Sequence, residues 1–330
     1  MRAPHIDRSL TLHFKGDWGR ANLHRALGFL CYELCRLAGP HTKVAIWNGR
    51  GAADNIIAVG RGEVDVALTT PSTFTAMAVR GVGPFQGESY PHLRSLGHVP
   101  QHDRLVVAVR AEIGVRSFAE LRDKKPALRI TAGIDDGYSF MGFGAQQLFE
   151  ASGITRQDVE SWGGSFLERE EPRQCTSDML RGDADAIVQE AVMTAYWKEL
   201  ADKVDLAFLP IEPDAAEMLY RRFGWPTATL PAGYLRGIDR EMRFLDFSHF
   251  LLIATADLPD DVAYALAWSL IERWETLEAQ YRHIPPERSP ISYPIDPKAA
   301  WRSAVPLHRG AERYYRDAGH LDAERRGNVP

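Results

Sequence analysis

Four segments of the sequence bring chemically active side chains to the end of a short apolar run. In the stretch GRGEVDVALTTPSTFTAM, residues 60–77, an apolar strand leads through Thr69, Thr70 and Ser72 into a helix. Free backbone N–H groups at the start of a helix favour an anion, and hydroxyl groups can hydrogen-bond to it. The sequence therefore predicts an anion-binding loop here. The simpler interpretation is an N-cap that holds no ligand.

The loop KGDWGRAN, residues 15–22, adds basic and aromatic groups after the first apolar run. Arg20 suits a carboxylate because its guanidinium donates two parallel hydrogen bonds. Trp18 offers a flat face on which an apolar or aromatic ligand can stack, and Asn22 offers a further hydrogen bond. The alternative is that Arg20 is solvated and Trp18 packs beneath the loop.

Three carboxylates follow two other apolar runs. Asp135 and Asp136 come after ALRITAG, with Tyr138 and Ser139 beside them, and Glu190 comes directly after DADAIVQ. Such a group can bind an amine, hold a metal ion or exchange protons with a substrate. If the protein is an enzyme, Asp136 and Glu190 are its catalytic candidates. The alternative is that one of the two aspartates only shapes a turn before the next glycine.

The remaining motifs point to neither a cofactor nor a metal. Gly163 and Gly164 in WGGSF allow a ligand to contact the backbone, but they match no nucleotide-binding motif, and no Walker, GxGxxG, GxSxG or HExxH pattern occurs. His98 and His102 in GHVPQHD have a spacing that is unspecific for a metal. His249 lies in an apolar strand, which predicts a core histidine. We expect no cofactor and no metal ion.

Strand and helix signals alternate along the chain, which is typical of α/β layers. Strands are expected at 10–14, 43–47, 64–68 and 104–110, and a helix over 22–37. Because such sheets bind ligands beyond the carboxyl ends of their strands, loops 15–22, 69–72, 134–140 and 189–190 are expected to meet at one cleft. The strand order predicts two lobes with a two-segment hinge: 1–103 plus 225–330, and 104–224.

Composition narrows the class of protein. The chain of 330 residues is 45% hydrophobic and has a formal net charge of −5, so we expect no nucleic-acid partner. No apolar stretch approaches the roughly 20 residues that a membrane span needs, so no direct membrane insertion is expected. The start of the sequence has no signal-peptide pattern, which predicts a cytoplasmic protein if Met1 is the true start.

Five segments, in order along the chain, resemble the TAXI family of solute-binding proteins of TRAP transporters. They are NIIAVGRGEVDVALTT, RLVVAVRAEIGVRSFAELRDKK, LRGDADAIV, DLPDDVAYALAWSLIE and AVPLHRGAERYYRDAGHL. The resemblance implies a periplasmic-binding-protein type II fold with a ligand in the interlobe cleft, a TRAP membrane subunit as partner and a periplasmic location. That the ligand is a carboxylate is expected from Arg20, Ser72 and the neighbouring backbone N–H groups. His308, in the terminal motif, is expected to have a structural role at the start of a helix.

Two loops depart from the family pattern, which keeps other functions open. The first loop lacks the usual Gly/Thr-rich composition, and DDGYSFMG stands where the family has a GSGT-like loop. Ser139 takes the serine position there. The primary prediction is a solute-binding protein for a small organic acid. The alternatives are a lyase or decarboxylase on the same fold, acting on an aromatic or keto acid, and a cytosolic ligand sensor.

Overall fold

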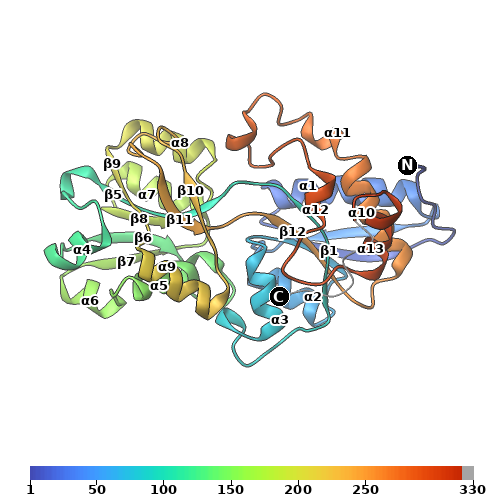
Figure 1. The fold of residues 1–330 in the computed structure, drawn as a ribbon, viewed down its shortest axis with the longest axis horizontal. Coiled ribbons are helices and arrows are strands. Elements are labelled where there is room, and N and C mark those ends of the chain that lie inside the picture. Colours follow the sequence, from blue (N-terminus) through green and yellow to red (C-terminus); the bar gives the residue numbers. More distant parts are fainter. Residues whose placement is uncertain (322–330) are drawn as a thin grey trace. The chain divides into compact units, whose positions relative to one another are not determined.

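The computed structural model describes residues 1–321, which form two compact α/β units (Figure 1). Unit 1 combines Met1–His102 with the segment from Ser248 onward, and unit 2 is Asp103–Phe247. The chain therefore crosses between the units twice. No helix in the described part is long and apolar enough to cross a bilayer.

Unit 1 is built on a five-stranded sheet in the order β2-β1-β3-β12-β4. β1, β2 and β3 are parallel, and β12 runs antiparallel to both β3 and β4. Its strands are β1 Thr11–Lys15, β2 Lys43–Trp47, β3 Val66–Thr69, β4 Leu93–Val99 and β12 Phe250–Thr255. Its helices are α1 Asn22–Leu37, α2 Ala53–Gly60, α3 Thr73–Arg80, α10 Asp260–Glu272, α11 Glu275–Glu278, α12 Pro297–Ala300 and α13 Arg309–Asp317, with 3-10 turns at Gly83–Phe85 and Pro286–Arg288.

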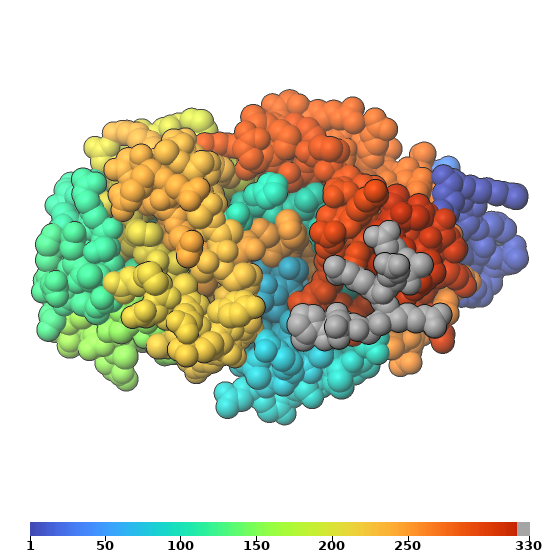
Figure 2. Space-filling model, viewed as in Figure 1, coloured from blue at the N-terminus to red at the C-terminus, as the bar shows by residue number. Residues whose placement is uncertain are grey.

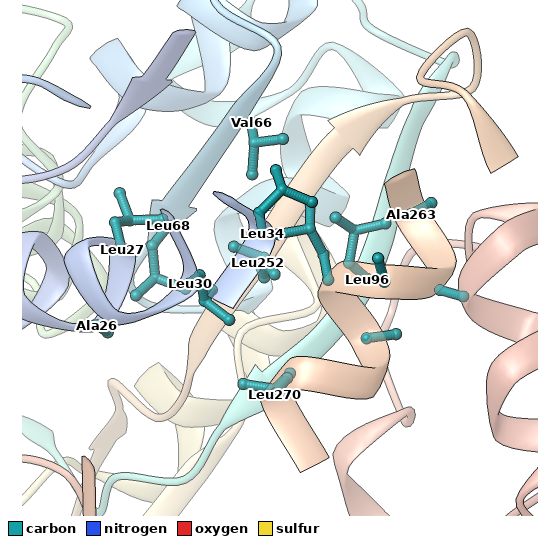
Figure 3. Close-up of a cluster of buried hydrophobic side chains, with 14 of the residues drawn as sticks. Ala26, Leu27, Leu30, Leu34, Val66, Leu68, Leu96, Leu252, Ala263 and Leu270 are labelled. Carbon is teal, nitrogen blue, oxygen red and sulfur yellow. The ribbon is translucent and has the colours of Figure 1, made fainter. Parts of the chain in front are cut away.

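The core of unit 1 forms where α1 and α10 pack on this sheet. Apolar residues at helical spacing on α1, among them Leu27, Leu30 and Leu34, meet Leu68 of β3 and Leu252 of β12 (Figure 3). Five apolar residues at helical spacing along α10 and the turns that follow it are also buried: Val262, Leu266, Leu270, Trp274 and Leu277. This packing fixes the strands of unit 1 and therefore the loops at their ends.

Unit 2 contains a seven-stranded sheet in the order β10-β11-β5-β8-β6-β7, with β9 also paired to β5. β6, β7 and β8 are parallel, whereas β5 is antiparallel to β8, β9 and β11. Its strands are β5 Arg104–Arg110, β6 Arg129–Gly133, β7 Ser165–Arg169, β8 Ala186–Gln189, β9 Leu206–Leu209, β10 Thr227–Leu230 and β11 Met242–Asp246. Its helices are α4 Phe118–Lys124, α5 Phe140–Ala151, α6 Arg156–Ser161, α7 Pro172–Arg181, α8 Ala195–Lys203 and α9 Pro213–Phe223, with a 3-10 turn at Ala111–Ile113.

The second crossing lies later in the chain than the sequence prediction placed it. Residues 225–247 were assigned to the first lobe, but β10 and β11 form an antiparallel pair that adds to β5. Their backbone hydrogen bonds therefore belong to unit 2, and the chain returns to unit 1 at Ser248. The first crossing falls between His102 and Asp103, one residue before the predicted boundary.

Candidate functional site

The carboxyl ends of β1, β2 and β3 carry three loops that are hydrogen-bonded to one another. Gly16 N–H donates to the Trp47 carbonyl at 3.0 Å, Gly49 N–H to the Asp17 carbonyl at 3.0 Å, and Thr70 N–H to the Gly51 carbonyl at 3.0 Å. Loops 15–22 and 69–72 therefore share one edge of the unit 1 sheet. A third loop, 48–52, lies between them in this network.

A buried carboxylate organises the first of these loops. Asp17 is 1% exposed, and its Oδ2 accepts the N–H groups of Leu23 at 2.9 Å and His24 at 3.3 Å. Its Oδ1 accepts the Ala21 N–H at 3.3 Å. The start of α1 is thus satisfied by the chain itself, so this helix end offers less to a ligand anion. The sequence interpretation missed Asp17, although an acidic residue just before a helix is a known start signal.

The residues predicted in the first loop differ in solvent exposure and in the contacts they already make. Arg20 is exposed and Trp18 is partly buried. Asn22 is the first residue of α1, and its Oδ1 accepts the Tyr281 hydroxyl at 3.0 Å. Asn22 therefore anchors the helix to a neighbouring segment. Arg50, between two glycines of the 48–52 loop, was missed and adds a second guanidinium to this set of loops.

The hydroxyl groups that follow β3 largely join loops. Thr69 is buried, and its Oγ1 donates to the carbonyls of Gly51 at 3.1 Å and Ala52 at 3.3 Å. Thr70 Oγ1 accepts from Gln101 Nε2 at 3.2 Å. The N–H and hydroxyl of Ser72 both donate to the Ser248 carbonyl, at 3.2 and 3.3 Å. Thr69 is structural, whereas Thr70 and Ser72 keep some exposed surface.

Asn55 is a further residue that fixes this edge. It is fully buried in α2, and its Nδ2 donates to the carbonyls of Lys15, Gly16 and Leu68 at 3.2, 3.0 and 2.8 Å. One side chain therefore ties the end of β1 to the end of β3.

In unit 2, the loop after β6 is a turn built on Asp136. Its Oδ1 accepts the N–H groups of Tyr138 at 3.0 Å and Ser139 at 3.2 Å, which supports the turn interpretation for one of the two aspartates. Asp135 and Tyr138 are exposed. Partial burial, with the nearby carboxylates of Glu168 and Asp136, raises the pKa of Asp135.

Ser139 stands apart from its exposed neighbours. It is 2% exposed and precedes α5, and its hydroxyl has no hydrogen-bond partner among the described residues. A buried hydroxyl without a partner costs free energy, so this group is suited to contact a ligand or an ordered water.

The two predicted glycines lie at the opposite edge of the unit 2 sheet. Gly163 and Gly164 immediately precede β7, while residues 134–140 and 190 follow β6 and β8. Because these strands are parallel, the start of β7 is separated from that edge by the length of a five-residue strand, about 16 Å. Gly163 has φ of +89° and ends a helical turn. The structure does not bring these glycines together with Asp136, Ser139 or Glu190.

Glu190 forms a hydrogen-bonded acid pair with Asp103. Asp103 is 1% exposed, and its carboxylate accepts the N–H groups of Ala191 at 2.7 Å, Val192 at 3.1 Å and Arg104 at 2.7 Å. Burial raises the pKa of Asp103, and these donors oppose that rise. Burial and the Asp103 carboxylate raise the pKa of Glu190 well above its usual range. The donors make Asp103 the carboxylate and Glu190 the protonated partner.

Buried polar groups surround this pair. Burial raises the pKa of Tyr196, and burial also raises the pKa of the Cys175 thiol. Gln189 Nε2 donates to Cys175 Sγ at 3.3 Å. Chemically, Glu190 can donate a hydrogen bond or a proton, a capacity that a solvated glutamate lacks at neutral pH. The structure places no set of three or more metal-ligating side chains together within residues 1–321.

The fold matches that of solute-binding proteins along nearly its whole length. A TctC solute-binding protein from Polaromonas superposes with a TM-score of 0.50 at 14% identity, covering 95% of this chain and 99% of that one. PhnD1 from Prochlorococcus marinus, solved with methylphosphonate, superposes with a TM-score of 0.52 at 11% identity, covering 94% and 99%. The protein therefore has the two-lobe α/β fold of periplasmic solute-binding proteins.

Sequence comparison is more specific than these superpositions. The model of the NMT1-like family matches residues 33–319, from the middle of α1 to just beyond α13. The chain belongs to the NMT1-like family.

Proposed function

We propose that this protein is a solute-binding protein of the TAXI type, which captures a small organic acid for a TRAP-type transporter in the periplasm. The observation that carries the proposal is the joined set of loops 15–22, 48–52 and 69–72 at one edge of the unit 1 sheet. These loops carry Arg20 and Arg50, and guanidinium groups are suited to carboxylates. Membership of the NMT1-like family and the solute-binding-protein fold support the same class.

Arg20 is the group assigned to the ligand carboxylate, with nearby backbone N–H groups completing the contact. Ser72 joins this contact when its hydroxyl turns from the Ser248 carbonyl to the ligand. A charge-assisted hydrogen bond contributes about 1.5–3 kcal/mol, which is roughly 10- to 100-fold in affinity. Trp18, in the same loop as Arg20, offers aromatic surface. These residues are assigned to the ligand by the proposal.

The test is calorimetric titration of the purified protein with a panel of small mono- and dicarboxylates. Arg20→Ala is expected to weaken binding of the best acid about 10- to 100-fold, and Arg50→Ala is measured beside it. Arg116→Ala, which removes an exposed guanidinium from unit 2, is the matched control. Equal binding by Arg20→Ala and the control would remove Arg20 from the site. Binding of amines or sugars in place of acids would reject the carboxylate class.

A second candidate function rests on the Glu190–Asp103 pair. A protonated glutamate held by a buried carboxylate is suited to general acid–base catalysis, as in a lyase or decarboxylase acting on an aromatic or keto acid. Incubation with such acids and mass spectrometry of the products separates the two functions. Turnover that is lost in Glu190→Gln would support the enzyme, whereas binding without turnover supports the receptor.

A further inference from the structure

Unit 1 contains a pocket of about 360 Å³ that the carboxylate proposal does not use. Its walls come from residues 98–102 at the end of β4, from His249 before β12, and from the segment 286–299. That last segment belongs to the orange and red part of the chain, which forms surface in Figure 2. The volume lies at the small end of the range for small-molecule sites.

Hydrogen bonds hold the walls of this pocket in place. Ser292 N–H donates to the Pro100 carbonyl at 2.8 Å, and Ile295 N–H donates to Glu278 Oε1 at 2.7 Å. The Tyr293 hydroxyl donates to the Ile284 carbonyl. Three of the lining residues are prolines, whose rings restrict the backbone further. The cavity is therefore preformed, which lowers the entropy cost of binding.

Three imidazoles line the pocket in a defined arrangement. The rings of His98 and His249 stack with centroids 4.6 Å apart and planes 9° apart, and His102 meets His249 edge-on at 6.3 Å. His98 Nδ1–H donates to the Arg302 carbonyl at 3.1 Å, which leaves the lone pair of the neutral ring on Nε2. His249 Nδ1 accepts the Gln101 N–H at 3.1 Å. His249 was predicted to be a core residue; it instead lines this pocket.

The stack argues against a metal site. Ring-nitrogen lone pairs lie in the ring planes, so two parallel imidazoles do not direct them at one ion. Within residues 1–321, no three His, Cys, Asp or Glu side chains lie together in a geometry that could hold a metal ion.

The charges on the lining favour a cation. Asp296 and Glu287 contribute carboxylates, and among residues 1–321 no lysine or arginine lines the pocket. Asp296 Oδ1 accepts the Lys298 N–H at 2.9 Å. The charge of this carboxylate raises the pKa of His98, and the charge of the nearby Arg302 opposes it. Burial nevertheless lowers the pKa of His98, so its ring stays neutral and accepts hydrogen bonds. Carboxylates, a neutral imidazole acceptor and flat aromatic faces together match an ammonium group.

We propose that this pocket binds a small organic cation of the amine or diamine class. The ammonium group contacts Asp296 and His98, and its carbon chain lies against Tyr293 and the prolines. Neither Arg20 nor Ser72 lines the pocket, although Ser72 hydrogen-bonds to the Ser248 carbonyl beside His249. Variants of Arg20 therefore test the carboxylate proposal without changing the lining of this pocket.

The experiment is calorimetric titration with 1,4-diaminobutane, with choline as a cation that lacks N–H donors and with acetate as an anion. The diamine is expected to bind more tightly than choline, and acetate is expected not to bind. Histidine side-chain ¹H–¹⁵N spectra are expected to shift for the pocket imidazoles as the diamine is added. Asp296→Asn is expected to weaken diamine binding at least 10-fold, because Asn keeps the helix cap and loses the charge.

Asp257→Asn, which removes an exposed carboxylate elsewhere in unit 1, is the matched control and is expected to bind like the unchanged protein. Glu287→Gln is measured as a second variant in case Asp296→Asn fails to fold. Diamine binding that neither pocket variant weakens would overturn the proposal. An absence of diamine binding at millimolar concentration would also overturn it. The proposal would equally fail if Zn²⁺ alone produced the same shifts in the histidine spectra. Loss of acid binding in Arg20→Ala leaves this outcome unaffected.

Discussion

Glu190 donates its carboxyl proton toward Asp103, and Asp103 is held as a carboxylate by three backbone N–H groups. This pairing changes what the carboxylates of unit 2 can do. A protonated Glu190 can donate a hydrogen bond or a proton, whereas a charged one can only accept.

The pairing predicts a specific pH dependence of stability. Burial raises the pKa of Glu190 in the folded protein, so between the unfolded value, about 4.3, and the folded value the native state binds more protons than the unfolded state. Stability from this group is fully present below the unfolded pKa and is lost as pH rises through the folded pKa. Glu190→Gln keeps a donor to Asp103 and does not titrate. The free energy of unfolding of Glu190→Gln, relative to that of the unchanged protein, is therefore expected to increase from pH 4 toward pH 8.

Urea unfolding at several pH values measures this difference. Glu241→Gln, an exposed glutamate in the same unit, is the control and is expected to follow the unchanged protein. Parallel stability curves for Glu190→Gln and the unchanged protein would show that Glu190 is ionised at neutral pH.

The backbone beside this pair also makes a prediction. Ala191 has φ of +66°, a left-handed conformation that costs a non-glycine residue about 1–2 kcal/mol, and its N–H reaches Asp103 in that conformation. Ala191→Gly removes the strain and adds about 0.5–1 kcal/mol of chain entropy cost. The free energy of unfolding is therefore expected to stay level or rise by up to about 1 kcal/mol.

Ala216→Gly is the matched control, because Ala216 lies inside α9. Ala216→Gly is expected to lower the free energy of unfolding by about 1 kcal/mol, the usual cost of glycine in a helix. If both glycine variants lose the same stability, the strain at Ala191 is absent in solution.

Local patterns in the sequence predicted much of the fold. The helix expected over 22–37 matches α1, and the runs KVAIW and RLVVAVR match β2 and β5. Their periodicity or apolar composition is contained in a few adjacent residues. The pair β10 and β11 was missed because its stability depends on β5, more than 100 residues earlier in the chain for both strands. Pairing at that separation leaves little local signal.

In the candidate site, too, some features could be predicted from local sequence and others depend on tertiary structure. Loop positions after strands were predictable, because parallel strands place their carboxyl ends at one edge. The roles of Asp17, Asn55 and Asp103 were not, because each side chain bonds backbone groups that only tertiary structure brings near. Asp103 was noted only within an unspecific histidine segment.

The terminal motif PLHRGAERYY gives the last prediction, because the structure assigns it to packing. His308 Nδ1 accepts the Gly310 N–H at 3.0 Å, so the expected structural role at a helix start is confirmed. A Cβ on Gly310 would lie 2.0 Å from the Asp260 carbonyl oxygen, so α13 meets the start of α10 through this glycine. Gly310→Ala is therefore expected to destabilise unit 1 by about 1–3 kcal/mol, the usual cost of overpacking.

Gly28→Ala is the matched control, since within residues 1–321 nothing beyond the adjacent backbone of α1 lies within 4 Å of the added Cβ. It is expected to stabilise by about 0.5–1 kcal/mol, because alanine suits a helix better than glycine. Thermal unfolding should then move the two variants in opposite directions. A Gly310→Ala protein as stable as Gly28→Ala would show that α13 and α10 do not approach this closely. Acid binding in Gly310→Ala, measured where the variant is folded, is expected to be unchanged, because the motif supports the unit without contacting Arg20.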